Sequence, residues 1–201
     1  MSKKSKGRNM RKSPISIALR EAPRLFIILA FGTSGFCFAA FGDAPSEQPK
    51  APETCVRFIY MVSKDRETKK EYVQAIGKAA QSVRKWYADQ LEGWTFRLHD
   101  PIVEEVKSDK EATWFTGNPN SSQKDNWGFL NTRAETKRLC DFDRNRERFV
   151  YVVYSDGPGD KGRAMPGFVY LPEDDLLGLV GMHPTQKDVQ RWVGGLAHEL
   201  G

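Results

Sequence analysis

Cysteine and histidine, the side chains that bind transition metals most readily, are scarce in this sequence. The 201 residues include three of each. Neither Cys55 nor Cys140 lies in a close cluster of cysteine and histidine, so neither is predicted to be a metal ligand. In an oxidising compartment these two thiols could pair, but they are also explained as two separate buried thiols. The sequence leaves both alternatives open.

Beyond residue 42 the chain also lacks an excess of positive charge. Residues 1–42 hold eight of the 31 Lys and Arg residues but one of the 26 Asp and Glu residues. The rest therefore carries 23 basic and 25 acidic side chains, a net charge of −2, although the whole chain has a formal charge of +5. A folded part with this balance exerts no overall attraction on a phosphate backbone. Nucleic acid is thus excluded as a partner inferred from charge.

Charge is absent from residues 25–42, an apolar segment that follows the basic N-terminus. A basic region, an apolar region and then small residues are typical of a secretory signal, and Ala40 and Gly42 suit cleavage before Asp43. The alternatives are an uncleaved anchor, since these 18 residues approach a membrane-spanning length, and a buried core helix. We expect an exported protein (secreted, periplasmic or membrane-anchored) that contacts the membrane only through this segment.

The remaining sequence predicts one folded domain after a linker. Residues 43–54 are rich in proline and charge, which is typical of a flexible linker. The apolar run at residues 55–62 indicates a strand, and apolar residues spaced by three and four predict an amphipathic helix over residues 71–91. A second strand is expected over residues 95–108. Strand, long helix and strand form a βαβ unit.

Strands and helices continue to alternate along the chain. In order, we expect a short helix and loop at 110–122, a helix at 124–139, a solvated turn at 140–148, a buried central strand at 149–155, a loop at 156–167, a short edge strand at 168–171 and helical turns at 173–179. The pattern predicts an α/β or α+β fold. It contains a mixed twisted sheet, a long early helix and a last helix at the C-terminus.

The last helix has an unusual polar face. Thr185 and Asp188 form a plausible capping pair at its start. Its apolar stripe comprises Val189, Trp192, Val193, Leu196 and Leu200. On the opposite side of the helix, viewed down its axis, His198 points in a direction between those of Gly194 and Gly195. A glycine inside a helix costs about 1 kcal/mol relative to alanine, so we expect another backbone or a substrate to pass close by, and the helix to line a cleft.

His198 and Glu199 match the first two residues of a zinc-binding helix motif. Catalytic zinc takes three protein ligands and a water. Histidines at i and i+4 share one face of a helix, and a glutamate after the first histidine can act as general base. The second histidine would stand at position 202, one beyond Gly201. Taken alone, the pair is also explained as a polar helix end, with His198 complementing the helix dipole.

The stretch RWVGGLAHELG, residues 191–201, resembles the start of the active-site helix of metzincin-type zinc metallopeptidases. Their signature is His-Glu-x-x-His-x-x-Gly-x-x-His, often with Leu-Gly after His-Glu. Residues 162–181 also resemble those of secreted bacterial members. The resemblance extends over residues 55–201, its specific part is the last dozen residues, and the second histidine, the glycine and the third ligand are absent up to Gly201.

This resemblance implies a metzincin-like N-terminal subdomain, with an edge strand beside the cleft. It implies that His198 is a zinc ligand and that Glu199 is the general base. A bound peptide would run antiparallel to the edge strand. The residues of that strand are Phe168, Val169, Tyr170 and Leu171.

The implied function is an exported zinc metallopeptidase that acts on peptides or proteins. Because the motif is cut short, we expect this chain to be a truncated form, inactive as given, with zinc bound weakly or not at all. The alternative is an exported, non-catalytic α/β domain that binds a peptide at its sheet edge or has a structural role. Neither function fixes the oligomeric state.

Other candidate ligands have structural explanations. His183 precedes a proline in a loop and is expected to be a surface histidine. His99 lies in a strand and is expected to be structural. The acidic run at residues 173–175 suits a helix start, where the helix dipole favours negative charge, better than a cation site.

Overall fold

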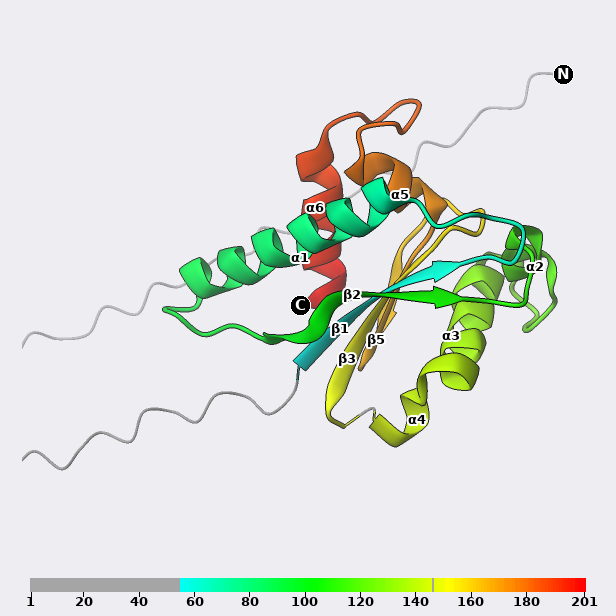
Figure 1. Cartoon of the computed structure of the whole chain (residues 1–201), viewed down its shortest axis with the longest axis horizontal. Helices are drawn as coiled ribbons and strands as arrows, with labels where there is room; N and C mark the ends of the chain where they lie inside the picture. Colours follow the sequence, from blue (N-terminus) through cyan, green and yellow to red (C-terminus); the bar gives the residue numbers. More distant parts are fainter. Residues whose placement is uncertain (1–54, 146) are drawn as a thin grey trace, which may run out of the picture. The chain divides into compact units, whose positions relative to one another are not determined.

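The computed structural model describes residues 55–145 and 147–201; the expected signal or anchor (1–42) and linker (43–54) lie outside this part. A five-stranded sheet is flanked by helices on both faces (Figure 1). The strands are β1 (Cys55–Val62), β2 (Arg97–Lys107), β3 (Phe149–Ser155), β4 (Arg163–Met165) and β5 (Phe168–Leu171). The helices are α1 (Lys70–Gln90), α2 (Ala112–Gly117), η1 (Lys124–Asn126), α3 (Trp127–Cys140), α4 (Phe142–Asn145), α5 (Glu173–Leu179) and α6 (Val189–Leu200). Within this part, no helix combines the length and apolar character needed to cross a membrane.

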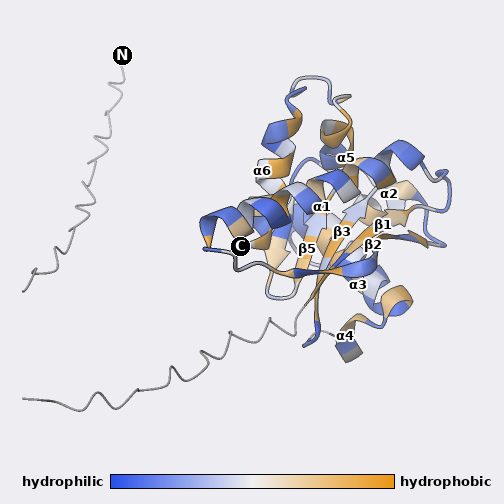
Figure 2. Cartoon of the chain, turned by 60° about the vertical axis from the view of Figure 1, so that its left-hand side comes forward, coloured by the Kyte–Doolittle hydropathy of each residue, from blue (hydrophilic) through white to orange (hydrophobic). Residues whose placement is uncertain are grey.

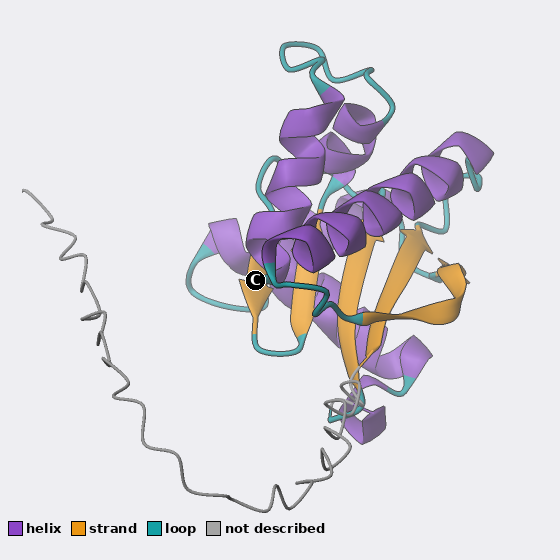
Figure 3. Ribbon diagram, turned by 90° about the vertical axis from the view of Figure 1, so that its left-hand side faces the viewer, coloured by secondary structure: helices purple, strands orange, loops and turns teal. Residues whose placement is uncertain are grey.

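The strand order is β2-β1-β3-β5-β4. The first four strands in this order are parallel to one another, and β4 runs antiparallel to β5. The mixed sheet with the long helix α1 between β1 and β2 confirms the predicted α/β class. Figure 3 shows α1 crossing one face of the sheet, with α6 beside it.

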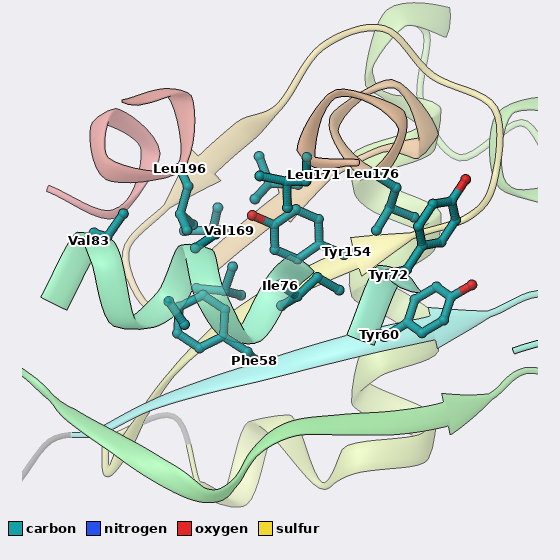
Figure 4. Close-up of a cluster of buried hydrophobic side chains, with 14 of the residues drawn as sticks. Phe58, Tyr60, Tyr72, Ile76, Val83, Tyr154, Val169, Leu171, Leu176 and Leu196 are labelled. Atoms are coloured by element: carbon teal, nitrogen blue, oxygen red, sulfur yellow. The ribbon is translucent and has the colours of Figure 1, made fainter. Parts of the chain in front are cut away.

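Helices α1, α5 and α6 cover one face of the sheet. Their apolar side chains meet the strands in a buried cluster that includes Phe58, Ile76, Tyr154, Val169, Leu176 and Leu196 (Figure 4). Tyr60 and Tyr72 meet edge to face, with ring centroids 5.8 Å apart. This cluster fixes α6 to the sheet, because Leu196 is fully buried in it.

Helices α2, α3 and α4 cover the other face. A second cluster there includes Ile59, Phe115, Cys140, Phe142, Tyr151 and Phe168. Since both faces are covered, β1 and β3 are mostly apolar rather than alternating, with Arg57 as the one charged residue of the two strands, and Figure 2 shows hydrophobic residues concentrated in the strands. Cys55 and Cys140 are both buried and free, and burial raises the pKa of Cys140 to about 11. They are therefore two separate buried thiols.

The structure confirms the strands predicted at residues 55–62 and 149–155, and the long helix with a shift of one residue at each end. The solvated turn predicted at residues 140–148 is corrected. This stretch contains α4, and Phe142 is 3% exposed because its ring packs on Tyr151 and Phe168. The charged residues on either side of Phe142 in the sequence led to the prediction of a solvated turn, although Phe142 itself is a buried core residue.

The edge position predicted for Phe168–Leu171 is also corrected. These residues form β5, which lies between β3 and β4, so the short strand β4 takes the edge. Residues 156–167, predicted as a loop, contain that strand. Pro166 and Gly167 make the turn between β4 and β5, and Gly167 has a positive φ of 81°. Proline followed by glycine at positive φ is typical of a tight turn, and this signal marks the hairpin in the sequence.

Candidate functional site

One of the two edge strands of the sheet, β4, borders the candidate site. Strand β4 pairs with β5 on one side, and in the described part of the chain no strand pairs with its other side. The unpaired N–H and C=O groups of such an edge can bind an extended peptide as an additional strand. An edge of this kind therefore exists, but it is β4 (Arg163–Met165) and not the predicted Phe168–Leu171.

Helix α6 runs close to this edge and carries both predicted site residues. It begins after Asp188, whose side chain accepts a hydrogen bond of 3.0 Å from the Gln190 backbone N–H. Asp188, and not Thr185, is thus the capping residue. Leu196 anchors the helix in the core, and Trp192, Val193 and Leu200 of the stripe are partly buried against the same cluster.

Glu199 faces the edge strand. It is half-buried, and a Cβ placed on Gly162 would lie 3.7 Å from its Cγ atom. Gly162 directly precedes β4, so the Glu199 side chain lies next to the backbone that enters the edge strand. A carboxylate here could act on a carbonyl or a water held close to β4.

His198 faces a different direction. Its side chain is exposed and lines a groove of about 820 Å³ between α1 and α6. Trp86, which is 51% exposed, and Tyr87 form the α1 wall of this groove. The Tyr87 hydroxyl donates a hydrogen bond of 3.1 Å to the Ala197 carbonyl and holds the two helices together. The imidazole is therefore available to a ligand.

The two glycines beside His198 are open to solvent. A Cβ on Gly194 or on Gly195 would meet nothing within 4 Å in the described residues. No part of this domain passes close enough to explain them. Gly194 and His198 do line a groove, as expected, but the expected close approach of another backbone is not found in the described chain.

Asp175 is a buried carboxyl group that sequence reasoning missed. It is 7% exposed, and burial, followed by the charges of Asp174 and Glu199, raises its pKa to about 7. The acidic run does start α5 as predicted, but Asp175 lies on the buried face. The signal was available, since Asp175 precedes buried Gly178 and Leu179 by three and four residues, which is one helical face.

The residues described do not by themselves fit a catalytic zinc ion. No group of three or more His, Cys, Asp or Glu among them could hold a metal. His198 is one exposed ligand, whereas a catalytic zinc site needs three. The described site thus offers one candidate zinc ligand, His198, which faces the α1–α6 groove, and one carboxylate, Glu199, which faces β4.

His183 and His99 are structural, which corrects the surface position expected for His183. The His183 side chain is 12% exposed. Its Nδ1 accepts a hydrogen bond of 3.0 Å from the Gln186 N–H, and its ring lies 4.8 Å from that of Trp192. It orders the loop before α6. The His99 ring packs against Phe149, as expected for a structural residue.

Comparison with known proteins gives a distant structural likeness. No family model matches the chain, and no curated protein matches it. Crystal structures of wild-type OgpA from Akkermansia muciniphila match with a TM-score of 0.52, at 15% and 16% identity, over 79% of this chain. A structure of catalytically inactive OgpA in complex with an O-glycopeptide substrate, glycodrosocin, matches with the same TM-score at 14% identity.

At this level of identity the likeness shows the fold alone. This chain shares its mixed α/β fold with the matched part of OgpA. The chain spans about half the length of the OgpA chains it matches, 50% and 51% in the two wild-type structures.

Proposed function

We propose that this chain forms the sheet-bearing part of an exported zinc metallopeptidase that cleaves peptides bound along β4. The observation that carries the proposal is the position of Glu199, which lies on α6 beside Gly162 and the open edge strand. The distant fold likeness to an enzyme that takes an O-glycopeptide substrate supports a peptide as substrate.

In this proposal the edge strand binds and orients the substrate. Backbone groups of β4 pair with the backbone of the peptide, and this pairing does not depend on the side chains of the peptide. Glu199 acts as general base toward a water close to the peptide carbonyl. His198 supplies one zinc ligand, and the other ligands would come from outside the described residues.

A second function is favoured by a specific observation. The described part offers an open sheet edge but only one zinc ligand, His198. An exported, non-catalytic protein that binds peptides at β4 would need no more than this. The two functions predict the same binding edge but differ in cleavage.

Two steps separate these functions. First, the transcript is sequenced beyond the codon for Gly201; a histidine codon at 202, followed by a later glycine and histidine, supports the peptidase. Second, the protein from the complete reading frame is assayed with labelled peptides and zinc. We expect Glu199→Gln to lower the cleavage rate at least ~100-fold without changing peptide affinity.

Glu105→Gln is the matched control, because Glu105 is exposed on the far strand β2. It should leave cleavage unchanged. Peptide binding with no zinc-dependent cleavage would reject the peptidase and leave the binding protein. Equal cleavage by the Glu199→Gln variant and the unchanged protein would reject Glu199 as the base.

Export is part of the proposal and has its own test. We propose that residues 1–42 direct the chain out of the cytoplasm. Mass spectrometry of the protein recovered from culture medium or from membranes identifies its N-terminus. A mature N-terminus at Asp43 supports a cleaved signal, an intact segment in membranes supports an anchor, and recovery in the cytoplasm contradicts both.

A further inference from the structure

A second cavity, of about 390 Å³, lies beside β4 on the opposite face from Glu199. Its lining includes Lys124, Asp125, Asp160, Lys161, Arg163 and Tyr170. We name it the Arg163 cavity. Arg163 is the first residue of β4, so this cavity adjoins the same open edge as the proposed peptide site.

The floor of the Arg163 cavity is shaped by Tyr170 and two glycines. A Cβ on Gly128 would lie 2.6 Å from the Tyr170 hydroxyl oxygen, and one on Gly159 would lie 2.9 Å from it. Only glycine allows both backbones to approach the hydroxyl this closely. Burial raises the pKa of Tyr170, so the phenol stays protonated and can donate a hydrogen bond.

The walls of the cavity carry five charged side chains, of which Lys124 lies over the Trp127 ring, with its Nζ atom 5.9 Å from the ring centroid. Lys124, Lys161 and Arg163 oppose Asp125 and Asp160, which leaves one positive charge in excess. None of these five side chains forms an ion pair or a side-chain hydrogen bond with any residue in the described part of the chain. Arg163 is half-buried, so its guanidinium is the cation best shielded from solvent.

The register of the sheet relates this cavity to Glu199. Arg163 pairs with Tyr170, and Ala164 pairs with Val169. Paired residues point to the same face of a sheet. Tyr170 belongs to the cluster under α3 and Val169 to the cluster under α6. Arg163 therefore points to the α3 face and Ala164 to the α6 face.

A peptide added to the outer edge of β4 would follow the same alternation. Successive side chains of a strand point to opposite faces. One side chain of the peptide would thus point toward α6 and Glu199, and a neighbouring one toward α3 and the Arg163 cavity. The Arg163 cavity can therefore bind a peptide side chain that neighbours the residue at which Glu199 acts.

We propose that the Arg163 cavity binds an acidic side chain, Asp or Glu, of a peptide held along β4. This inference rests on the proposed function. Arginine binds a carboxylate with paired, charge-assisted hydrogen bonds, and Lys161 and the Tyr170 hydroxyl add further donors. A single carboxylate balances the one excess positive charge, which selects an acidic side chain over a neutral or basic one.

The test measures peptide affinity by fluorescence anisotropy on the full chain. Three pools of labelled decapeptides are compared, each built on the same sequence of Ser, Thr and Val. Within a pool, one residue is placed at each of the ten positions in turn. That residue is Glu in the first pool, Gln in the second and Lys in the third. We expect the Glu pool to bind about tenfold tighter than the Gln pool, equivalent to ~1.4 kcal/mol, and the Lys pool to bind more weakly. Arg163→Gln and Lys161→Gln should each reduce this preference.

Lys161 is exposed in a loop, so Lys161→Gln tests the inference even if Arg163→Gln disturbs the edge strand. Lys187→Gln is the matched control, because Lys187 is exposed before α6, and it should keep the full preference. Equal binding of the Glu and Gln pools would overturn the inference, as would variants that weaken both pools equally. If either result is found, cleavage of the Gln pool that depends on Glu199 would still support the proposed peptidase function. If no pool binds at all, both the proposed function and the acidic preference of the Arg163 cavity are overturned.

Discussion

Gly162 and Glu199 meet where the edge strand approaches the last helix. A Cβ at Gly162 would lie 2.9 Å from Leu171 and 3.7 Å from the Cγ atom of Glu199. A larger residue would first meet the side chain of Leu171 on β5. Glu199 therefore lies next to the start of the edge strand, although 37 positions separate the two residues in the sequence.

The buried carboxyl group of Asp175 should make stability depend on pH. Its pKa of about 7 in the folded state exceeds its ordinary value of 3.8, so the folded state binds more protons between these values. The free energy of unfolding should therefore fall by about 2–4 kcal/mol as the pH rises from ~4 to ~7. Urea denaturation at pH 5 and pH 8 measures this difference.

Asp175→Asn removes the buried charge, so it should abolish most of this pH dependence and stabilise the protein relative to the unchanged chain at pH 8. Asp89→Asn is the control, because Asp89 is an exposed partner of Lys85 and should shift stability by less than ~0.5 kcal/mol. Equal stability of the unchanged chain at pH 5 and pH 8 would contradict the prediction.

Two helical glycines should respond in opposite directions to alanine. A Cβ on Gly178 of α5 would lie 2.1 Å from the Trp192 ring of α6, so Gly178→Ala forces the two helices apart and should cost on the order of 2–3 kcal/mol. A Cβ on Gly194 meets nothing within 4 Å. Gly194→Ala should stabilise α6 by about 1 kcal/mol.

Thermal unfolding of the two variants measures both effects, and each is the control for the other. A stability loss in Gly194→Ala would show that a segment outside the described residues packs against Gly194. That result would locate the occupant of the groove beside His198.

Zinc should bind this chain only weakly. Among the described residues His198 has no second and third ligand, so we expect a Kd weaker than about 10 µM. Competition with a chelating dye measures it, and His198→Ala should change the result less than twofold. Nanomolar affinity that depends on His198 would contradict the prediction and reveal further ligands.

The sequence determined the elements whose pattern is local. The apolar runs of β1 and β3 and the helical spacing of α1 were sufficient to predict them, since a strand buried on both faces is apolar along most of its length. The sequence also predicted α6, which the structure confirms, while the roles of His198 and Glu199 stay a prediction. These predictions follow from side-chain spacing alone, which requires no knowledge of neighbouring elements.

Only the tertiary structure decided which strand forms the edge, and where the polar groups meet. Strand β4 has three residues and little β propensity of its own; its pairing with β5 makes it a strand and places it outside Phe168–Leu171. Burial of Asp175 and the Arg163 cavity both arise between segments distant in the chain. Long-range packing sets the edge, the pKa and the cavity, because each depends on which surfaces exclude water and not on local sequence.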